Sequence, residues 1–167
     1  ASDVYKRQFF NGLDALMLYM GSKGGDSICE IAGGEARLTR VLIRYQKVKT
    51  GPNFDLVCDC DLTLRSNHNL FWQYRRGRKP NIISMAPMCR SVGGWGKFNR
   101  RMNSNTWWDN YRHTGKPLGR LCGQVALAQL KDDLDFLNEQ PQGSDLYKEE
   151  PWPEVLEHER VVRGVLH

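Results

Sequence analysis

A chain of 167 residues with 40% hydrophobic content is long enough for one globular domain with a buried core. No apolar run approaches the roughly 18 to 20 residues of a membrane span, so none is expected. The net charge of +5 is unevenly distributed, because residues 90–120 are basic and residues 132–159 are acidic. The five cysteines and four scattered histidines have no zinc-binding spacing, so we expect no metal site and a reducing, intracellular compartment.

Both ends of the chain look interrupted. Residues 3–8 resemble the translation of a transposase sequencing adaptor, so residues 1–8 are left out of the fold prediction. The apolar run at 161–167 is typical of the start of a strand. We therefore expect residues 9–167 to form a single domain, incomplete at its C-terminus, within a longer polypeptide. The fragment itself is expected to be inactive as an enzyme.

The predicted elements alternate between helices and strands. A lead-in helix is expected over residues 9–20, where apolar residues recur at helical spacing. Short apolar runs bounded by glycine, proline or turn residues predict strands at 27–32, 54–60, 81–86 and 134–138. Apolar residues spaced 3.6 apart predict helices around 38–45, from Ser66 or Asn67 to Gly77, and at 117–130 and 154–160.

The connecting segments complete this prediction. Residues 51–53 are expected to break the chain before the second strand, residues 91–97 to form a glycine-rich loop, and residues 107–112 an irregular prelude to a helix. Strands that alternate with helices predict an α/β protein. We expect a Rossmann-like, doubly wound and mainly parallel sheet with helices on both faces.

The junction between the first strand and the next helix is a candidate cofactor loop. Glu30, Ala32, Gly34 and Ala36 have the spacing acid-x-small-x-Gly-x-small, with Gly33 inside the turn. Small residues let the backbone approach a ligand, and a helix N-terminus adds a positive dipole. A plain structural turn is the alternative.

A second acid is expected near a cofactor ribose. Such a carboxylate commonly follows the second strand, which makes Asp59 or Asp61 the candidate. Both residues lie on the same face of an ideal strand, so their spacing does not choose between them. Either acid could instead cap the end of the strand.

Cys89 and Glu139 are the candidate catalytic residues. Cys89 follows the third predicted strand, with Pro87 before it and a basic, glycine-rich loop after it. Exposure and nearby cations favour the thiolate, so Cys89 is a candidate nucleophile, although a lone loop cysteine is often a bystander. Glu139 follows the fourth strand and is a candidate acid, with a surface carboxylate as the alternative.

The basic stretch is a candidate nucleic-acid interface. Cations interleaved with aromatic residues favour a phosphate backbone and an unstacked base, whereas the simpler interpretation is a solvated surface loop. The candidate residues are Arg90, Lys97, Arg100, Arg101, Trp107 and Arg112.

Taken together, three motifs resemble those of the DNA cytosine-C5 methyltransferases. The turn at 30–36 resembles the S-adenosylmethionine loop of class I methyltransferases, residues 85–89 resemble the Pro-Pro-Cys loop, and residues 138–141 resemble the strand end with the Glu-Asn-Val motif. The resemblance covers residues 27–152. It implies a class I methyltransferase core, with S-adenosylmethionine held by Glu30, Ala32, Gly33, Gly34, Pro87 and Asp59 or Asp61.

The resemblance also implies a mechanism and a partner. Cys89 would add to C6 of cytosine while Glu139 engages N3, which makes C5 nucleophilic toward the sulfonium methyl group. The expected partner is DNA, with RNA not excluded, and a DNA partner would imply a nuclear location in a nucleated cell.

Departures from the family pattern leave two alternatives open. Met88 replaces the second proline, Gln140 and Pro141 replace the asparagine and valine, and the family's later arginine motif has no counterpart. The chain is also similar to methyltransferase-like segments of retroelement polyproteins, so it could be a degenerate, non-catalytic module that interacts with nucleic acid or has a structural role. The other alternative is a methyltransferase that acts on a different substrate.

Overall fold

The structure is a computed structural model that describes residues 26–46 and 49–164. The predicted lead-in helix at 9–20 and the adaptor-like segment lie outside the described residues. The chain divides into two compact units, unit 1 at residues 1–84 and unit 2 at residues 85–167.

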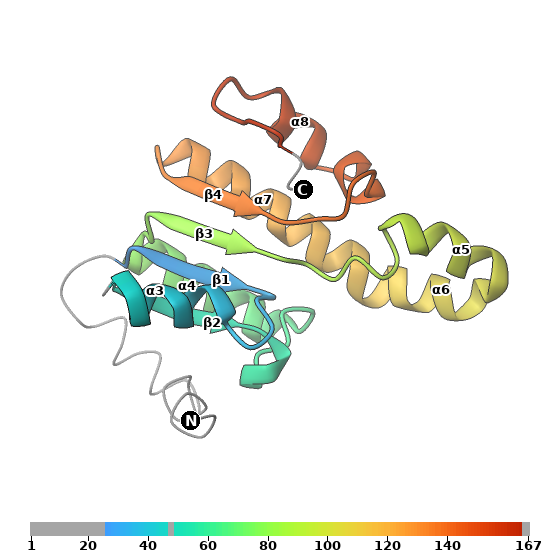
Figure 1. The fold of residues 1–167 in the computed structure, drawn as a ribbon, viewed down its shortest axis with the longest axis horizontal. Coiled ribbons are helices and arrows are strands. Elements are labelled where there is room, and N and C mark those ends of the chain that lie inside the picture. Colours follow the sequence, from blue (N-terminus) through green and yellow to red (C-terminus); the bar gives the residue numbers. More distant parts are fainter. Residues whose placement is uncertain (1–25, 47–48, 165–167) are drawn as a thin grey trace. The chain divides into compact units, whose positions relative to one another are not determined.

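The described strands form one parallel sheet in the order β2-β1-β3-β4 (Figure 1). They are β1 (Ile28–Ile31), β2 (Thr50–Phe54), β3 (Ile82–Met85) and β4 (Asp135–Asn138). The chain runs from β1 to β2 on one side and then returns past β1 to β3, which is the order of a doubly wound sheet. The predicted α/β, Rossmann-like fold class is thereby confirmed at this level.

Helices connect the strands. The α-helices are α3 (Arg37–Gln46), α4 (Arg65–Arg78), α5 (Gly94–Met102), α6 (Ser104–Asn110), α7 (Lys116–Lys131) and α8 (Trp152–Glu157). Three shorter turns are also present: the 3-10 helices η1 (Leu56–Cys58) and η3 (Asp145–Lys148), and the π-helix η2 (Tyr111–Gly115). None of the described helices is both long enough and apolar enough to cross a membrane.

Unit 1 combines an aromatic core with a buried ion pair. Phe54 at the end of β2 packs edge-on against Phe71 of α4, with ring centroids 5.1 Å apart, and lies 5.2 Å from Tyr74. Arg78 is paired with Asp26 at 2.8 Å, and the Tyr74 hydroxyl donates to the same carboxylate at 2.6 Å. Both charges are buried, so each depends on the other for compensation.

The second strand begins earlier than the sequence predicts. Residues 51–53 lie inside β2, and the strand ends at Phe54 where the prediction had it begin. The register with β1 gains one residue between Thr50 and Asn53, and a bulge at a sheet edge is where proline is tolerated. A Cβ on Gly51 would collide with the Tyr74 hydroxyl, so close packing also explains this glycine.

Unit 2 is organised around α7, close to the helix predicted at 117–130. Leu121 and Val125 are buried, as the apolar periodicity predicts. A Cβ on Gly119 would meet Leu146, and one on Gly123 would meet Pro151, so the two glycines create a groove on the helix. The Trp152 indole N–H donates to the carbonyl of Gly119 at 2.9 Å across this groove.

The predicted glycine-rich loop at 91–97 and irregular prelude at 107–112 are mostly helical. The carbonyl of Cys89 accepts from the backbone N–H groups of Val92 and Gly93, and this turn leads directly into α5 at Gly94. Residues 104–115 form α6 and η2, which run into α7. The loop prediction was wrong here because glycine, which is frequent in loops, can also begin a helix, as Gly94 does in α5.

Two smaller predictions about helices also differ. The α4 helix begins at Arg65 with no side-chain cap, so neither Ser66 nor Asn67 is its N-cap. On α3 the apolar face is only partly covered within the described structure, where Val41 is 51% exposed. The helix itself is confirmed, but its periodicity overstates its burial.

Candidate functional site

Glu30 at the end of β1 is built into the fold of unit 1. Its side chain is 4% exposed, and its Oε1 atom accepts a hydrogen bond at 2.7 Å from the backbone N–H of Thr39. Thr39 is in the first turn of α3, where backbone N–H groups lack partners within the helix. The acid of the predicted cofactor loop therefore caps the following helix.

Two acceptor oxygens converge on Gly33. A Cβ at this position would lie 2.5 Å from Oε2 of Glu30 and 3.0 Å from Oδ1 of Asn53, so only glycine fits without displacing them. Asn53 is 2% exposed, and its Oδ1 atom has no hydrogen-bond partner within the described structure. An orphaned acceptor beside a carboxylate oxygen suits a hydrogen-bond donor that carries positive charge.

Gly34 is held from both sides by the end of β2. Its N–H donates to Oδ2 of Asp55 at 3.0 Å, and its carbonyl accepts from Nδ2 of Asn53 at 2.7 Å. Gly34 has a φ of 57°, whereas Ala32 and Ala36 adopt similar left-handed values of 52° and 53° at a cost that glycine avoids. The turn is thus tightly bent. A Cβ built on Gly34 would have no other atom within 4 Å.

Asp59 and Asp61 lie in a turn and not on a strand. Asp59 is exposed and ends η1 with a φ of 57°, while Asp61 accepts from the backbone and hydroxyl of Thr63. The expectation that they share a strand face was therefore wrong. The acid directly after β2 is Asp55, which sequence reasoning missed because it placed the strand too late.

In unit 2, Cys89 follows β3 in an exposed loop. Its thiol is free, and its backbone carbonyl accepts from Val92 and Gly93 in the turn described above. Pro87, two residues earlier, is buried and fixes the entry to this loop. A Cβ on Gly93 would lie 2.9 Å from the carbonyl of Cys89, so this turn also requires its glycine.

The structure brings the Cys89 loop and the Glu139 segment together within unit 2. Gln140 donates from Nε2 to the carbonyl of Pro87 at 2.6 Å, and the backbone N–H of Glu139 donates to the carbonyl of Met85 at 2.9 Å. In the same network the hydroxyl of Ser144 donates to Oε1 of Gln140 at 3.0 Å. Glu139 itself is exposed. The two motifs, about 50 residues apart in sequence, therefore belong to one loop cluster.

Gln140 and Ser144 are positioning residues that the sequence did not indicate. Ser144 is buried and donates to the carbonyl of Val92. Nothing in the surrounding sequence predicts either feature. In the sequence, Gln140 stands out only because it departs from the family motif. Its hydrogen bond across 53 residues of sequence is a tertiary contact that no local pattern reveals.

The predicted nucleic-acid interface lies on helices α5, α6 and η2 and, at Arg90, on the turn that precedes α5. Arg100 stacks over Trp107 at 5.2 Å and over Trp108 at 5.6 Å, and Arg112 lies 5.7 Å from Trp108. Arg90, Arg100, Arg101 and Arg112 are all exposed. The side chain of Lys97 lies outside what the structure describes. Four exposed arginines thus lie in this part of unit 2.

Trp107 is closed to stacking by its neighbours. Tyr111 lies parallel to its ring, with centroids 5.1 Å apart and planes 7° apart, and Arg100 covers the ring as well. Its indole N–H donates to the carbonyl of Ser91 at 3.0 Å. Trp108, which is 41% exposed, is the more accessible indole of this cluster.

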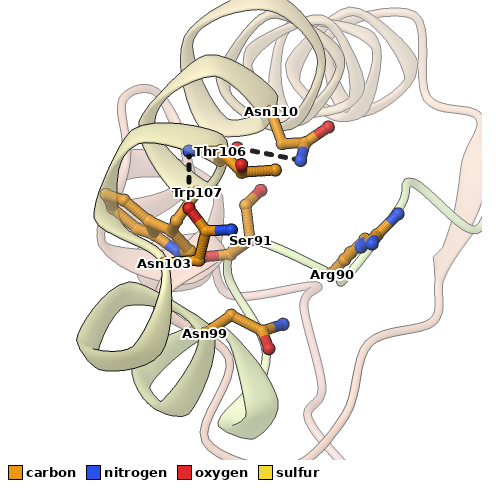
Figure 2. A pocket seen from close by; sticks show the side chains of 7 residues that line it. All are labelled: Arg90, Ser91, Asn99, Asn103, Thr106, Trp107 and Asn110. Carbon is orange, nitrogen blue, oxygen red and sulfur yellow. Dashed lines mark hydrogen bonds between the residues drawn. The ribbon is translucent and has the colours of Figure 1, made fainter.

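A polar pocket of about 170 Å³ lies beside this cluster. We call it the asparagine pocket, and Figure 2 shows its lining side chains. They are Arg90, Ser91, Asn99, Asn103, Thr106, Trp107 and Asn110.

The thiols differ strongly in their surroundings. Complete burial raises the pKa of Cys29 and of Cys122, and burial raises the pKa of Cys60 to about 12. Cys58 is half-buried and its pKa is raised, first by desolvation and then by Asp55. Cys89 is the one exposed thiol among the described residues, so it is the thiol most open to a substrate.

No group of three or more metal-ligating side chains occurs in the described part of the chain. Neither a scan against protein-family models nor searches of curated proteins and of solved structures found a match to this chain. The fold therefore defines a class, a Rossmann-like α/β protein with a parallel sheet. Function has to be argued from the residues themselves.

Proposed function

We propose that this chain belongs to an S-adenosylmethionine-dependent enzyme that methylates C5 of cytosine in nucleic acid. The observation that carries the proposal is the hydrogen bond from Gln140 to the carbonyl of Pro87, which ties the loop of an exposed thiol to the segment of an exposed acid. Chemistry at cytosine C5 needs both groups on one ring, because neither activates it well alone.

The residues have separate roles in this reaction. The thiolate of Cys89 forms a bond to C6 while the carboxyl group of Glu139 hydrogen-bonds N3 and stabilises the electron density that reaches the ring. S-adenosylmethionine supplies the methyl group that C5 takes up. Water would then take the C5 proton, the electron pair of the C5–H bond would restore the C5–C6 double bond, and sulfur would leave C6 with its bonding pair as the thiolate.

In unit 1, Glu30 and Asn53 would hold the cofactor's amino group. Oε2 of Glu30 and Oδ1 of Asn53 both approach Gly33, and Oδ1 has no partner in the described structure. We assign the ribose contact to Asp55 in preference to Asp59 or Asp61. Asp55 follows β2 directly and comes 21 residues after Gly34, close to the usual interval of about 20 residues.

The test is whether the enzyme to which this chain belongs forms 5-methylcytosine. A cytosine-containing single-stranded oligonucleotide would be incubated with the protein and S-adenosylmethionine, then digested to nucleosides for mass spectrometry. We expect 5-methylcytosine from the wild type and from Cys60→Ser, a matched thiol variant in unit 1, and none from Cys89→Ser. A methyl group on an exocyclic amine instead would assign the chain to the amino methyltransferases.

A second candidate is a nucleic-acid-binding module without turnover. This candidate is favoured because two polar groups of the turn after β1 already have partners within the protein. Oε1 of Glu30 is bonded to Thr39, and the N–H of Gly34 is bonded to Asp55. This candidate predicts binding to oligonucleotides with no methyl transfer and no affinity for S-adenosylhomocysteine. Calorimetry with S-adenosylhomocysteine separates the two, because the enzyme requires binding below millimolar concentrations.

A further inference from the structure

Apart from Arg90, the lining of the asparagine pocket is neutral and offers both donors and acceptors. Oδ1 of Asn103 accepts from the backbone of Thr106 at 3.4 Å, and Nδ2 of Asn110 donates to the carbonyl of Thr106 at 2.9 Å. Among the residues that the structure describes, no other group bonds Nδ2 of Asn103 or Oδ1 of Asn110, so both remain for a ligand. Within the described structure, no hydrogen bond holds the side-chain amide of Asn99, which also lines the pocket.

This chemistry narrows the class of ligand. The lining contains Arg90 and no carboxylate, so it does not suit a cation, and the amide oxygens that share the lining with Arg90 favour a ligand with hydrogen-bond donors over a bare anion. A side-chain amide instead matches the edge of a nucleobase, where donors and acceptors alternate. The volume of about 170 Å³ is several times the roughly 30 Å³ of one liquid water, so the pocket has room for a group of several atoms.

The surroundings indicate that such a base would arrive on a charged strand. Arg90 stands across the pocket from Asn103 and Trp107 (Figure 2), and its exposed guanidinium suits a phosphate. Exposed Arg100 and Arg101 lie on α5, the helix that also carries Asn99. Trp107 closes the wall of the pocket and offers no free face for stacking.

We propose that the asparagine pocket binds one unpaired nucleobase of single-stranded DNA or RNA by hydrogen bonds to its edge. Arg90 and Ser91 directly follow Cys89, so this base would be a neighbour of the one that meets the thiol. The proposal rests on the nucleic-acid partner of the proposed function. It does not rest on methyl transfer.

The test compares two fluorescent single strands of equal length and charge, one with bases and one with abasic sites, by anisotropy with the 167-residue chain. We expect the strand with bases to bind roughly five- to a hundredfold more tightly, the range of one bidentate amide–base contact. Asn99→Leu should remove most of this difference and leave the abasic affinity unchanged. Asn105→Leu, an exposed asparagine of α6 outside the pocket, is the matched control and should retain it.

Parallel DNA and RNA strands tell which sugar is accepted. Equal wild-type affinity for strands with and without bases would overturn the proposal without recourse to a variant, and so would equal weakening of both strands by Asn99→Leu. Absence of binding to any strand would overturn both this proposal and the nucleic-acid partner. Base-dependent binding without formation of 5-methylcytosine would support the pocket and contradict the catalytic function.

Discussion

The turn after β1 in unit 1 and the loop cluster of unit 2 both carry candidate site residues, but they hold these residues in place in different ways. In unit 1, Glu30 and Asn53 are buried, and each uses one end of its side chain to hold the turn while the other end approaches Gly33. In unit 2, Cys89 and Glu139 are exposed, and their loops are fixed by Gln140 and by backbone groups.

This difference separates two kinds of dependence. A side chain that both holds the fold and meets a ligand cannot be replaced without affecting both. A reactive side chain whose loop is held by its neighbours can be replaced with little loss of stability. We therefore expect substitutions at the candidate site of unit 1 to change stability and binding together, and those at Cys89 and Glu139 to change chemistry alone.

The largest expected effect is on the stability of unit 1. Asp26→Ala removes the buried partner of Arg78 and should lower the free energy of unfolding by about 3 to 5 kcal/mol. The control is Lys148→Ala, which breaks an exposed ion pair to Asp145 and should cost under about 1 kcal/mol. Urea unfolding measures both, and equal costs would contradict the view that unit 1 depends on buried polar contacts.

The next effect concerns the turn after β1, which is the candidate cofactor loop. Glu30→Gln keeps an acceptor for the N–H of Thr39 but removes the charge that would meet an ammonium group, so affinity for S-adenosylhomocysteine should fall roughly ten- to a hundredfold. Glu35→Gln, an exposed acid of the same turn, should bind like the wild type in calorimetry. Glu139→Gln should also leave this affinity unchanged. An unaltered affinity in Glu30→Gln would remove Glu30 from the site.

A smaller effect is expected for the exposed cations of α5. The double change Arg100→Glu, Arg101→Glu should weaken binding to all single strands and make the log-log salt slope less steep by about 1.4, because each phosphate contact contributes about 0.7. Arg76→Glu, an exposed cation of α4, is the control. Salt-independent binding by the wild type would contradict a phosphate-binding role for this surface.

The smallest effect is a pH dependence in unit 2. Burial, followed by the hydrogen bond that Tyr111 donates to Glu149, raises the pKa of Tyr111 from 10.0 to about 12. The folded state therefore keeps a proton that the unfolded state loses between pH 10 and 12, and this contribution to stability is lost as pH rises through that window. Tyr111→Phe should flatten the fall in urea midpoint. An identical pH profile for both proteins would refute the assignment.

Much of the fold follows from local patterns, but the boundaries that matter most do not. The β1 strand, the α7 helix and the alternation of strands and helices are visible in the sequence because burial follows their periodicity. The β2 strand was misplaced because Gly51 and Pro52 are breakers in most contexts. Here a sheet edge, a bulge and close packing against Tyr74 accommodate them.

The candidate site shows the same limit. Glu30, Gly33 and Cys89 could be chosen from sequence because each stands beside a strand end. Asn53 and Asp55 were missed through the misplaced strand, and Gln140 because its partner is 53 residues away. The contacts that bring residues together across the fold are set by tertiary packing, which no local pattern contains.

The most direct test of the central claim is covalent trapping on a single strand that carries 5-fluorocytosine, in the presence of S-adenosylmethionine. A single strand needs no base flipping, and fluorine at C5 blocks the elimination that would free Cys89. We predict a stable protein–oligonucleotide adduct by denaturing gel and intact mass, absent from Cys89→Ser and formed much more slowly by Glu139→Gln. An adduct that persists in Cys89→Ser, or methyl transfer to cytosine C5 without any adduct, would contradict the account.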